Sequence, residues 1–404
     1  MALDDCRNSD TLKLPAQSRP FPYWPLSGFY FFYFASIGIL APYLGLYLQS
    51  LGFCPRQIGV VVAVLFATKI VAPIIWGRLA DRRGKRVGIV RTGTLISVIA
   101  FTGAYFSPDA PSWLFVWWVL VAIVFGFFWN AGLPQVEAIT LRHLGKDSHR
   151  YGRIRLWGSV GFILSVLLLG ELLDRYPVDM VLHGTLALLI GIVLSAVLIS
   201  DVAGKPSHGE SGPIGAIIKQ PQVLALLAAC FLMQVSHGPF YGFYSIYLDE
   251  HLYDSSRIGQ LWALGVCAEV VLFIVIPRIL KHVGLRSLFL SAFAFSVLRW
   301  LLIAFFPLEL SVQAVAQLLH AITFGVFHTV AILLTHRFFV GNHQGQGQAL
   351  YNSVGFGAGY AAGALGGGFL WFHFDGQITY LAAAGVSILA LFIVWRWLDI
   401  ENSP

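Results

Sequence analysis

The chain has 404 residues, of which 57% are hydrophobic and only 11% are charged, and its mean hydropathy is +0.74. Soluble domains carry roughly 25% charged residues, so this composition cannot cover a water-exposed surface and excludes a soluble globular protein. In a soluble protein the net charge of +6 would favour a nucleic-acid partner. In a membrane protein such an excess is typical of cytoplasmic loops, so we expect the lipid bilayer, and no nucleic acid, as a partner.

Apolar runs of about 20 residues, which is the length needed to cross a bilayer as a helix, follow one another along the chain. The predicted spans are 23–49, 57–77, 87–106, 113–138, 152–173, 179–200, 222–248, 257–280, 286–306, 311–336, 346–371 and 376–398. The runs lack the alternation of transmembrane strands. They predict an all-α polytopic membrane protein with twelve transmembrane helices. The predicted divisions are a tail 1–22, a six-helix bundle 23–200, a linker 201–221, a second six-helix bundle 222–398 and a tail 399–404.

Residues 77–86 read GRLADRRGKR and place five basic residues in a predicted short loop between the second and third spans. Short loops rich in Lys and Arg stay on the cytoplasmic side of a membrane. With this loop inside, 21 of the 26 Lys and Arg residues fall on the cytoplasmic side and 3 fall outside. The pattern predicts that both termini are cytoplasmic, in the cell (bacterial inner) membrane.

The two predicted halves share a weak internal repeat. Arg78, Gly84 and Arg86 recur 200 positions later as Arg278, Gly284 and Arg286. Transporters built from such repeats bind their substrates near the membrane midplane, between the repeats. We therefore expect the functional site between the two halves.

The 77–86 segment resembles the loop motif G-x-L-(A)-D-x-x-G-(R/K)-(R/K) of the major facilitator superfamily. Residues 151–162, YGRIRLWGSVGF, and 319–328, LHAITFGVFH, resemble the 3-phenylpropionate permease branch, which is related to proton-coupled lactose and nucleoside permeases. The resemblance implies the major facilitator fold and a monomer without a cofactor. It implies proton symport of a small organic anion, an aromatic carboxylate such as 3-phenylpropionate, by alternating access. The alternatives are a proton-coupled nucleoside or sugar permease, or an exporter.

A membrane enzyme and a sensor are the candidates from other classes. No P-loop, nucleophile elbow or His-Glu-x-x-His pattern occurs in the sequence. We therefore expect no enzymatic activity. No spacing among the histidines or cysteines predicts a metal site.

Four ionisable residues lie deep within predicted spans: Lys69, Glu137, Glu269 and Arg299. Such charges are costly in a bilayer and normally face a cavity and a partner. We expect Lys69 to hold the substrate anion, and the alternative is that it pairs with a protein carboxylate such as Glu269. The second candidate anchor for the anion is Arg299.

The resemblance to lactose permeases implies that Glu269, Arg299 and His320 form the proton-coupling set. Those relatives have a second carboxylate one turn beyond the histidine, whereas this chain has Ile322 and Thr323. Glu269 is therefore the first candidate for the proton carrier, and His320 or His328 is the second, because imidazole exchanges protons near neutral pH. The alternative is a purely structural Glu269–Arg299 pair.

Further side chains of the first, fourth, seventh and tenth spans are predicted to line an aromatic cavity for the substrate. These are Tyr30, Tyr33, Asn130, His237, Tyr241 and Gln317. The alternative for each tyrosine is packing, or a place in the aromatic belt at a lipid interface.

The 77–86 segment is also the predicted gate. Gly77 and Gly84 allow tight turns and close approach of helices. Asp81 is expected to face the positive N-terminus of the eleventh span near Gly345. The predicted gating residues are Gly77, Asp81, Arg82, Gly84 and Arg86, together with a Glu137–Arg155 ion pair. The alternative is a solvated basic loop that only sets the topology.

Overall fold

The computed structural model describes residues 21–201 and 214–399, and it has no strand in either range. The predicted tails 1–22 and 399–404 and the predicted linker 201–221 lie mostly outside the described residues. The elements of the first range are α1 (Tyr23–Ser50), α2 (Pro55–Arg83), α3 (Arg86–Thr102), η1 (Gly103–Phe106), α4 (Pro111–Leu144), η2 (Gly145–Arg150), α5 (Tyr151–Leu173) and α6 (Met180–Leu198).

The second range is also helical throughout. Its elements are α7 (Gly215–Ile218), α8 (Pro221–Glu250), α9 (Ser255–Ile279), α10 (Leu285–Phe305), α11 (Leu310–Leu318), η3 (Ala321–Val326), α12 (Phe327–Phe338), η4 (Gly341–His343), α13 (Gln344–Asn352), η5 (Ser353–Gly359), α14 (Tyr360–His373) and α15 (Gly376–Trp397). Two of these, η3 and η5, are π-helices that interrupt the tenth and eleventh predicted spans.

The predicted all-α membrane fold is confirmed. Ten helical stretches of the described residues are long and apolar enough to cross a membrane. One of them, Pro111–Leu173, contains both α4 and α5. The Gly- and Gln-rich run from α13 to α14 does not meet the same criterion. Every predicted span coincides with a helix or with a helix interrupted by a π-helix, but the number of transmembrane spans remains a prediction.

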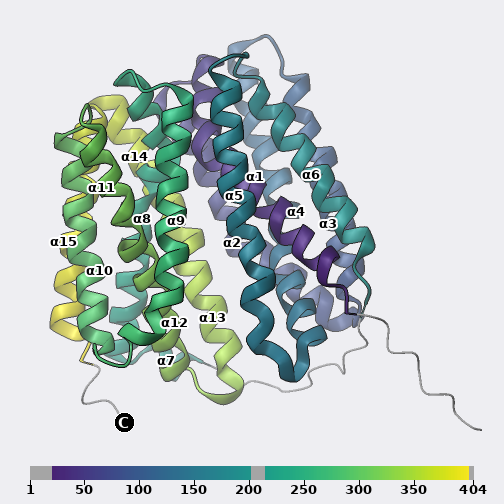
Figure 1. The fold of residues 1–404 in the computed structure, drawn as a ribbon, viewed down its shortest axis with the longest axis vertical. Helices are drawn as coiled ribbons and strands as arrows, with labels where there is room; N and C mark the ends of the chain where they lie inside the picture. The colour runs from purple at the N-terminus through teal and green to yellow at the C-terminus, as the bar shows by residue number, and fades with distance from the viewer. Residues whose placement is uncertain (1–20, 202–213, 400–404) are drawn as a thin grey trace, which may run out of the picture.

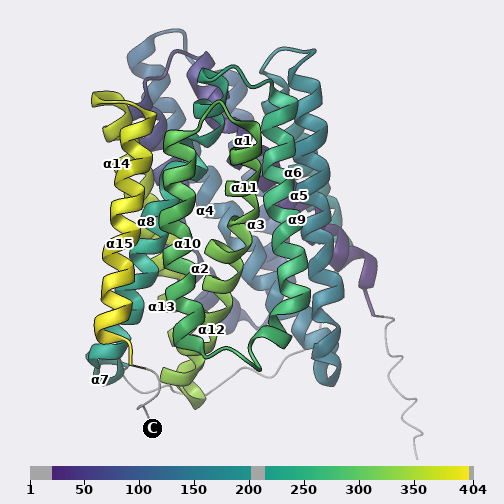
Figure 2. The same cartoon turned by 60° about the vertical axis from the view of Figure 1, so that its left-hand side comes forward.

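The helices gather in two groups. Figure 1 shows α1 to α6 on the right, in purple and teal, and α8 to α15 on the left, in green and yellow. In the first group α1 packs on α5 and α6, and in the second α15 packs on α8 and α10. The groups meet where α5 packs on α9 and where α2 packs on α14. The turned view in Figure 2 shows α9, α10 and α15 running roughly parallel along the long axis.

The two ends of the molecule differ in their connections. The connections 51–54, 174–179 and 251–254 lie at one end, called the upper end because it is uppermost in Figure 1. The α2–α3 connection lies at the lower end, where the described chain also ends after α15. This lower end is the one that the charge pattern predicts to be cytoplasmic.

The prediction of a loop over 77–86 is wrong for most of that segment. Helix α2 continues to Arg83, so Gly77, Asp81 and Arg82 lie in its last two turns. Gly84 follows with a φ of +67°, the left-handed conformation that commonly ends helices. Arg86 already begins α3, so that only two residues form the turn. An apolar-run analysis ends a helix where charge begins, whereas this helix continues beyond its apolar part.

Candidate functional site

The ionisable side chains predicted deep in the spans separate into two places. Arg299 of α10 lies in a polar cluster with His237 of α8, Glu269 of α9 and His320, which follows α11. Lys69 of α2 has no ion pair with any of them among the described residues. Instead it lines an apolar pocket.

The Arg299 guanidinium is fully buried and its donors are engaged. Its Nε donates to the carbonyl of Ala316 at 2.9 Å, and Nη1 faces Nδ1 of His320 at 3.1 Å. Nη2 donates to Oε1 of Gln317 at 3.4 Å. Because hydrogen bonds to an ionised group are stronger than neutral ones, this set stabilises a charge that would be costly to bury alone.

Two aromatic rings and two further polar groups complete the surroundings of Arg299. Its guanidinium carbon lies 4.2 Å from the ring centroid of Phe240 and 4.7 Å from that of Trp300, which are cation–π distances. Nη1 also lies 3.4 Å from Nε2 of His237 and from Oγ1 of Thr323. Arg299 is thus held by its own half of the molecule.

His320 connects Arg299 to Glu269. A guanidinium N–H can only donate, so Nδ1 of His320 accepts, and the neutral ring then carries its proton on Nε2. Nε2 lies 3.9 Å from Oε2 of Glu269. The alternative of a direct Glu269–Arg299 pair is not formed among the described residues, because the His320 imidazole lies between the carboxylate and the guanidinium. The alternative Lys69–Glu269 pair is likewise not formed within the described chain.

His237 has both ring nitrogens engaged. Nδ1 lies 2.9 Å from the carbonyl of Met233, so it donates there, and Nε2 is the acceptor that faces Arg299. The side chain is fully buried. In this conformation, a substrate would have to displace Arg299 from Nε2 to reach the ring.

His328 is separate from the Glu269–His320 contact. Its Nδ1 lies 2.8 Å from the hydroxyl of Tyr351. The Phe324 ring lies between the two imidazoles, with its centroid 5.4 Å from His320 and 5.8 Å from His328. The three predicted proton-coupling residues therefore form one pair and one separate group, divided by an aromatic ring in the π-helix η3.

Lys69 is the only charged residue that lines a pocket of about 80 Å³ between α1, α2, α4 and α8. The other lining residues are Ile37, Leu40, Ala41, Leu44, Gly45, Val62, Leu65, Phe66, Phe125, Trp129 and Tyr241. Nζ lies 5.2 Å from the ring centroid of Phe66. No hydrogen bond or ion pair of Lys69 occurs among the described residues. The pocket thus offers one positive charge among apolar and aromatic walls.

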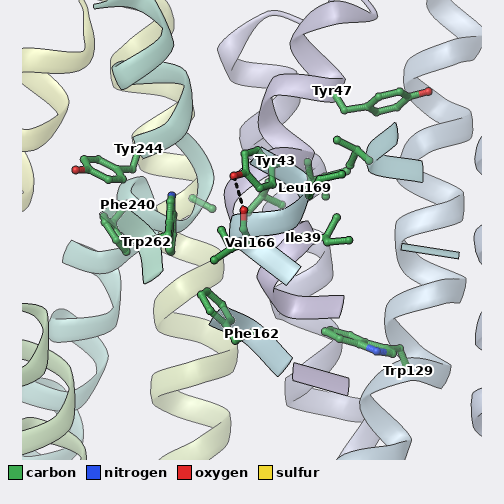
Figure 3. Packing of buried hydrophobic residues seen from close by; sticks show 14 of the residues in the cluster. Ile39, Tyr43, Tyr47, Trp129, Phe162, Val166, Leu169, Phe240, Tyr244 and Trp262 are labelled. Carbon is green, nitrogen blue, oxygen red and sulfur yellow. Dashed lines mark hydrogen bonds between the residues drawn. The ribbon is translucent and has the colours of Figure 1, made fainter. Parts of the chain in front are cut away.

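Three predicted substrate-binding residues lie at or near this pocket. Tyr241 lines it directly. Tyr33 stacks on the lining residue Trp129 with centroids 4.8 Å apart, and Asn130 donates to Oγ1 of Thr68 at 2.8 Å, next to Lys69 in the chain. Figure 3 shows Trp129 on a different helix from Phe240 and Trp262.

The other predicted substrate-binding residues lie elsewhere. Gln317 belongs to the Arg299 cluster. Tyr30 lies beside Arg155, with the guanidinium carbon 6.0 Å from its ring centroid. Neither residue lines the Lys69 pocket.

The predicted Glu137–Arg155 ion pair is not formed within 4 Å in the described chain. The Arg155 guanidinium lies over the ring of Phe34 at 3.7 Å. Glu137 accepts a hydrogen bond from the hydroxyl of Tyr151 at 3.4 Å. An aromatic face so close to the cation replaces the carboxylate as its neighbour.

Asp81 has a different partner from the one predicted. Its carboxylate accepts a hydrogen bond from Arg86, whose other Nη donates to Gln135 of α4 at 2.5 Å. Arg82 is exposed, and a Cβ on Gly77 would meet no atom within 4 Å. In this conformation the Asp81, Arg86 and Gln135 side chains join α2, α3 and α4 of one half, and Asp81 forms no hydrogen bond or ion pair with α13 in the described chain.

The MFS_1 like family model matches residues 23–382. The chain belongs to this family, and hence to the major facilitator transporters. It is 27% identical over 374 residues to a probable 3-phenylpropionic acid transporter of Escherichia coli (strain K12), covering 90% of this chain and 95% of that one. It is 26% identical over 371 residues to a maltose permease of Geobacillus stearothermophilus, covering 91% and 92%.

The fold of this facilitator is similar to that of a solved nucleoside transporter, NupG. The TM-score is 0.83 at 18% sequence identity, and the match covers 94% of this chain and all of that one. The predicted major facilitator fold is thereby confirmed. The protein is an integral membrane transporter and not an enzyme.

The sequence analysis of this facilitator missed the aromatic and polar residues that hold Arg299. Trp300 follows Arg299 directly and Phe240 is one turn beyond His237, so both positions carried a weak signal. Thr323 was noted only as a departure from the lactose permeases. The carbonyl of Ala316 had no signal at all, because any residue presents one.

Proposed function

We propose that this facilitator carries a small organic anion with an apolar, aromatic body across the membrane together with protons. The observation that carries the proposal is the Lys69 ammonium, which lines an apolar pocket and has no ion pair or hydrogen bond among the described residues. A charge within a membrane-spanning helix normally has a partner, so a charge without one in the described chain is suited to a partner from outside. An aromatic carboxylate supplies both the opposite charge and the apolar body.

The relatives support this substrate class without deciding it. The protein from Escherichia coli is named as a probable transporter of 3-phenylpropionic acid, which is a phenyl ring on a short carboxylic acid. Its carboxylate is complementary in charge to the Lys69 ammonium, and its phenyl ring is complementary to apolar walls that include Phe66, Phe125 and Trp129. We therefore propose 3-phenylpropionate as the first substrate to test.

We propose Glu269 as the proton carrier and His320 as the group that senses its charge. A proton on Glu269 removes the negative charge that faces Nε2 of His320. Because Nδ1 of the same ring is held by Arg299, the change is transmitted into a buried network. The separated His328 is the second proposed carrier. A monoanion that enters with one proton is electroneutral and gains free energy only from the pH gradient.

The membrane arrangement is also a proposal. The internal repeat supports bundles at 23–200 and 222–398, and the charge pattern supports a lower end in the cytoplasm with both termini. The family resemblance supports a monomer in the bacterial inner membrane. The gating residues around Asp81 and Arg86 would stabilise α2 against α3 and α4 at that end.

A second candidate is a neutral-solute permease. It is favoured by the similarity to a maltose permease at 26% identity. An exporter is the third candidate, because the chain is also 23% identical to a multi-drug resistance efflux pump homolog of Lactococcus lactis subsp. lactis.

Uptake into proteoliposomes separates these candidates. The substrates are 3-phenylpropionate, its neutral amide, a nucleoside and maltose, each with and without an inward proton gradient. We expect accumulation of the acid only, and only with the gradient. Accumulation of a neutral solute, or uptake of the acid that ignores the gradient, contradicts the proposal. Uptake driven by the reverse gradient identifies an exporter.

A further inference from the structure

Asp174 of the first helix group caps a helix of the second group at the upper end. Its Oδ1 accepts from the backbone N–H of Ser255 at 2.8 Å, and Oδ2 accepts from the N–H of Ser256 at 3.2 Å. Both serines begin α9, whereas Asp174 directly follows α5. The first N–H groups of a helix have no partner within that helix, so this carboxylate satisfies two of them across the interface.

The negative charge of Asp174 is favourable at the N-terminus of α9 and unfavourable at the C-terminus of its own helix, α5. As the C-cap residue of α5 it lies beside the negative end of that helix dipole, where a carboxylate is unfavourable. The positive end of α9 reverses the sign of the interaction. The neighbouring cation Arg175 pairs with Glu171. The cross-group contact therefore accounts for a carboxylate at this position.

The same helix start has a second, local cap. Asp254 is the N-cap residue of α9 and accepts from the N–H of Arg257 at 2.9 Å. The two aspartates thus serve the same helix end, one from within the group and one from across the interface. Separation of the two helix groups would break the hydrogen bonds of Asp174 and leave that of Asp254 intact.

The helices below this cap pack closely enough to transmit its position. The Tyr43 hydroxyl lies 2.9 Å from the carbonyl of Val166 in α5 and 3.2 Å from that of Ser255 in α9, and Figure 3 marks the first contact. A Cβ on Gly170 of α5 would lie 2.6 Å from the backbone carbonyl oxygen of Ser255 in α9, and a Cβ on Gly259 of α9 would lie 2.6 Å from that of Val166 in α5. Only glycine permits this approach, so an alanine at either position has to push α5 and α9 apart.

We infer that Asp174, with the Tyr43 and Gly170 packing beneath it, is a latch that holds the upper end of the transporter closed. Releasing the Ser255 and Ser256 N–H groups favours separation of α5 from α9 and opening of that end. The inference needs alternating access but no particular substrate, so it stands or falls independently of the anion proposed for Lys69. Asp174 thus caps the N-terminus of a helix of the other group at the upper end. At the lower end Asp81 accepts a hydrogen bond from Arg86 of its own group instead.

The test measures the distance between spin labels at the upper end by double electron–electron resonance. Labels are placed at Asp109→Cys and Leu308→Cys, one in each group, in the full chain with its four native cysteines replaced by alanine. In the Asp174→Ala variant we expect a longer distance, with the ratio of open to closed molecules raised roughly tenfold, equivalent to about 1.4 kcal/mol. Asp174→Asn, which keeps an acceptor without the charge, should give a smaller shift in the same direction.

Two further variants make the outcome specific. Asp254→Ala removes the local cap, with its contacts to the Arg257 N–H and the Ser256 hydroxyl, but keeps the Asp174 contacts to the two backbone N–H groups, and it should leave the distance unchanged. Gly170→Ala should lengthen the distance with Asp174 intact. Identical distributions for the parent and Asp174→Ala, or an equal shift in Asp254→Ala, would overturn the latch.

Discussion

Lys69 and Arg299 are both cations in the middle of apolar helices, yet their surroundings are opposite. Arg299 donates to a carbonyl, an amide oxygen and an imidazole and lies over two rings. Lys69 has one aromatic ring nearby and otherwise an apolar pocket. The described residues supply partners for the charge of Arg299 but no ion pair or hydrogen bond for that of Lys69. From this difference we propose a structural and coupling role for Arg299 and the recognition of an external anion for Lys69.

The largest expected effect of a substitution is on Arg299. Arg299→Met should lower stability by about 1–3 kcal/mol for each buried acceptor that loses its donor, namely His320, Gln317 and the Ala316 carbonyl. The measurement is the apparent melting temperature in detergent, with the exposed Arg278→Met as control. A melting temperature equal to that of the control would contradict a structural role of Arg299.

Lys69→Met should lower substrate uptake without lowering stability. We expect uptake of 3-phenylpropionate to fall about tenfold to hundredfold, as loss of a hydrogen bond to a charged group worth about 1.5–3 kcal/mol implies. The melting temperature should stay the same or rise, because an unpaired charge leaves an apolar site. Lys69→Arg should retain part of the uptake, and the exposed Lys85→Met should retain all of it. A large fall in the melting temperature of Lys69→Met would show that Lys69, like Arg299, stabilises the fold, and it would contradict a role in substrate binding alone.

Glu269→Gln separates proton coupling from binding. The amide cannot carry the proton, so accumulation above the external concentration should be lost while exchange of substrate across the membrane is partly retained. Uptake and counterflow assays with the same proteoliposomes measure both, and the exposed Glu171→Gln is the matched control. Normal accumulation would transfer the proton to His328 or another group.

Asn130→Ala should have the smallest effect of the four. It removes the 2.8 Å hydrogen bond to Thr68, the residue before Lys69, and such a bond contributes about 0.5–1.5 kcal/mol. We expect a several-fold weaker binding of the acid with little change in binding of its neutral amide. An equal change for both would show that Asn130 shapes the pocket rather than the position of the charge.

The fold was largely predictable because the signal is long and repeated. Apolar runs of about 20 residues specify where helices lie even when neighbouring positions vary. The error at 77–86 has a physical reason, since helix α2 continues through charged residues and ends only at Gly84 in its left-handed conformation. Hydropathy predicts which residues of a helix lie within the membrane, but it does not predict how far the helix continues beyond it.

The sequence indicated which ionisable residues lie in the candidate site, but it did not indicate which of them are in contact. Charge in apolar sequence identified Lys69, Glu269 and Arg299 without a structure. Depth along the spans suggested that Glu269 and Arg299 meet, but it could not place the His320 ring between them. That position depends on the end of α11 and on the π-helix η3, which no periodicity in the sequence indicated.

The central claim is that Lys69 binds the carboxylate of the substrate. Its most direct test is the affinity of the purified transporter for 3-phenylpropionate and for the neutral amide, measured by isothermal titration calorimetry with wild type and with Lys69→Met. We predict that wild type binds the acid at least about tenfold more tightly than the amide, as a charge-assisted contact implies. We predict that the substitution abolishes this preference. Equal affinity of both proteins for the acid would contradict the claim.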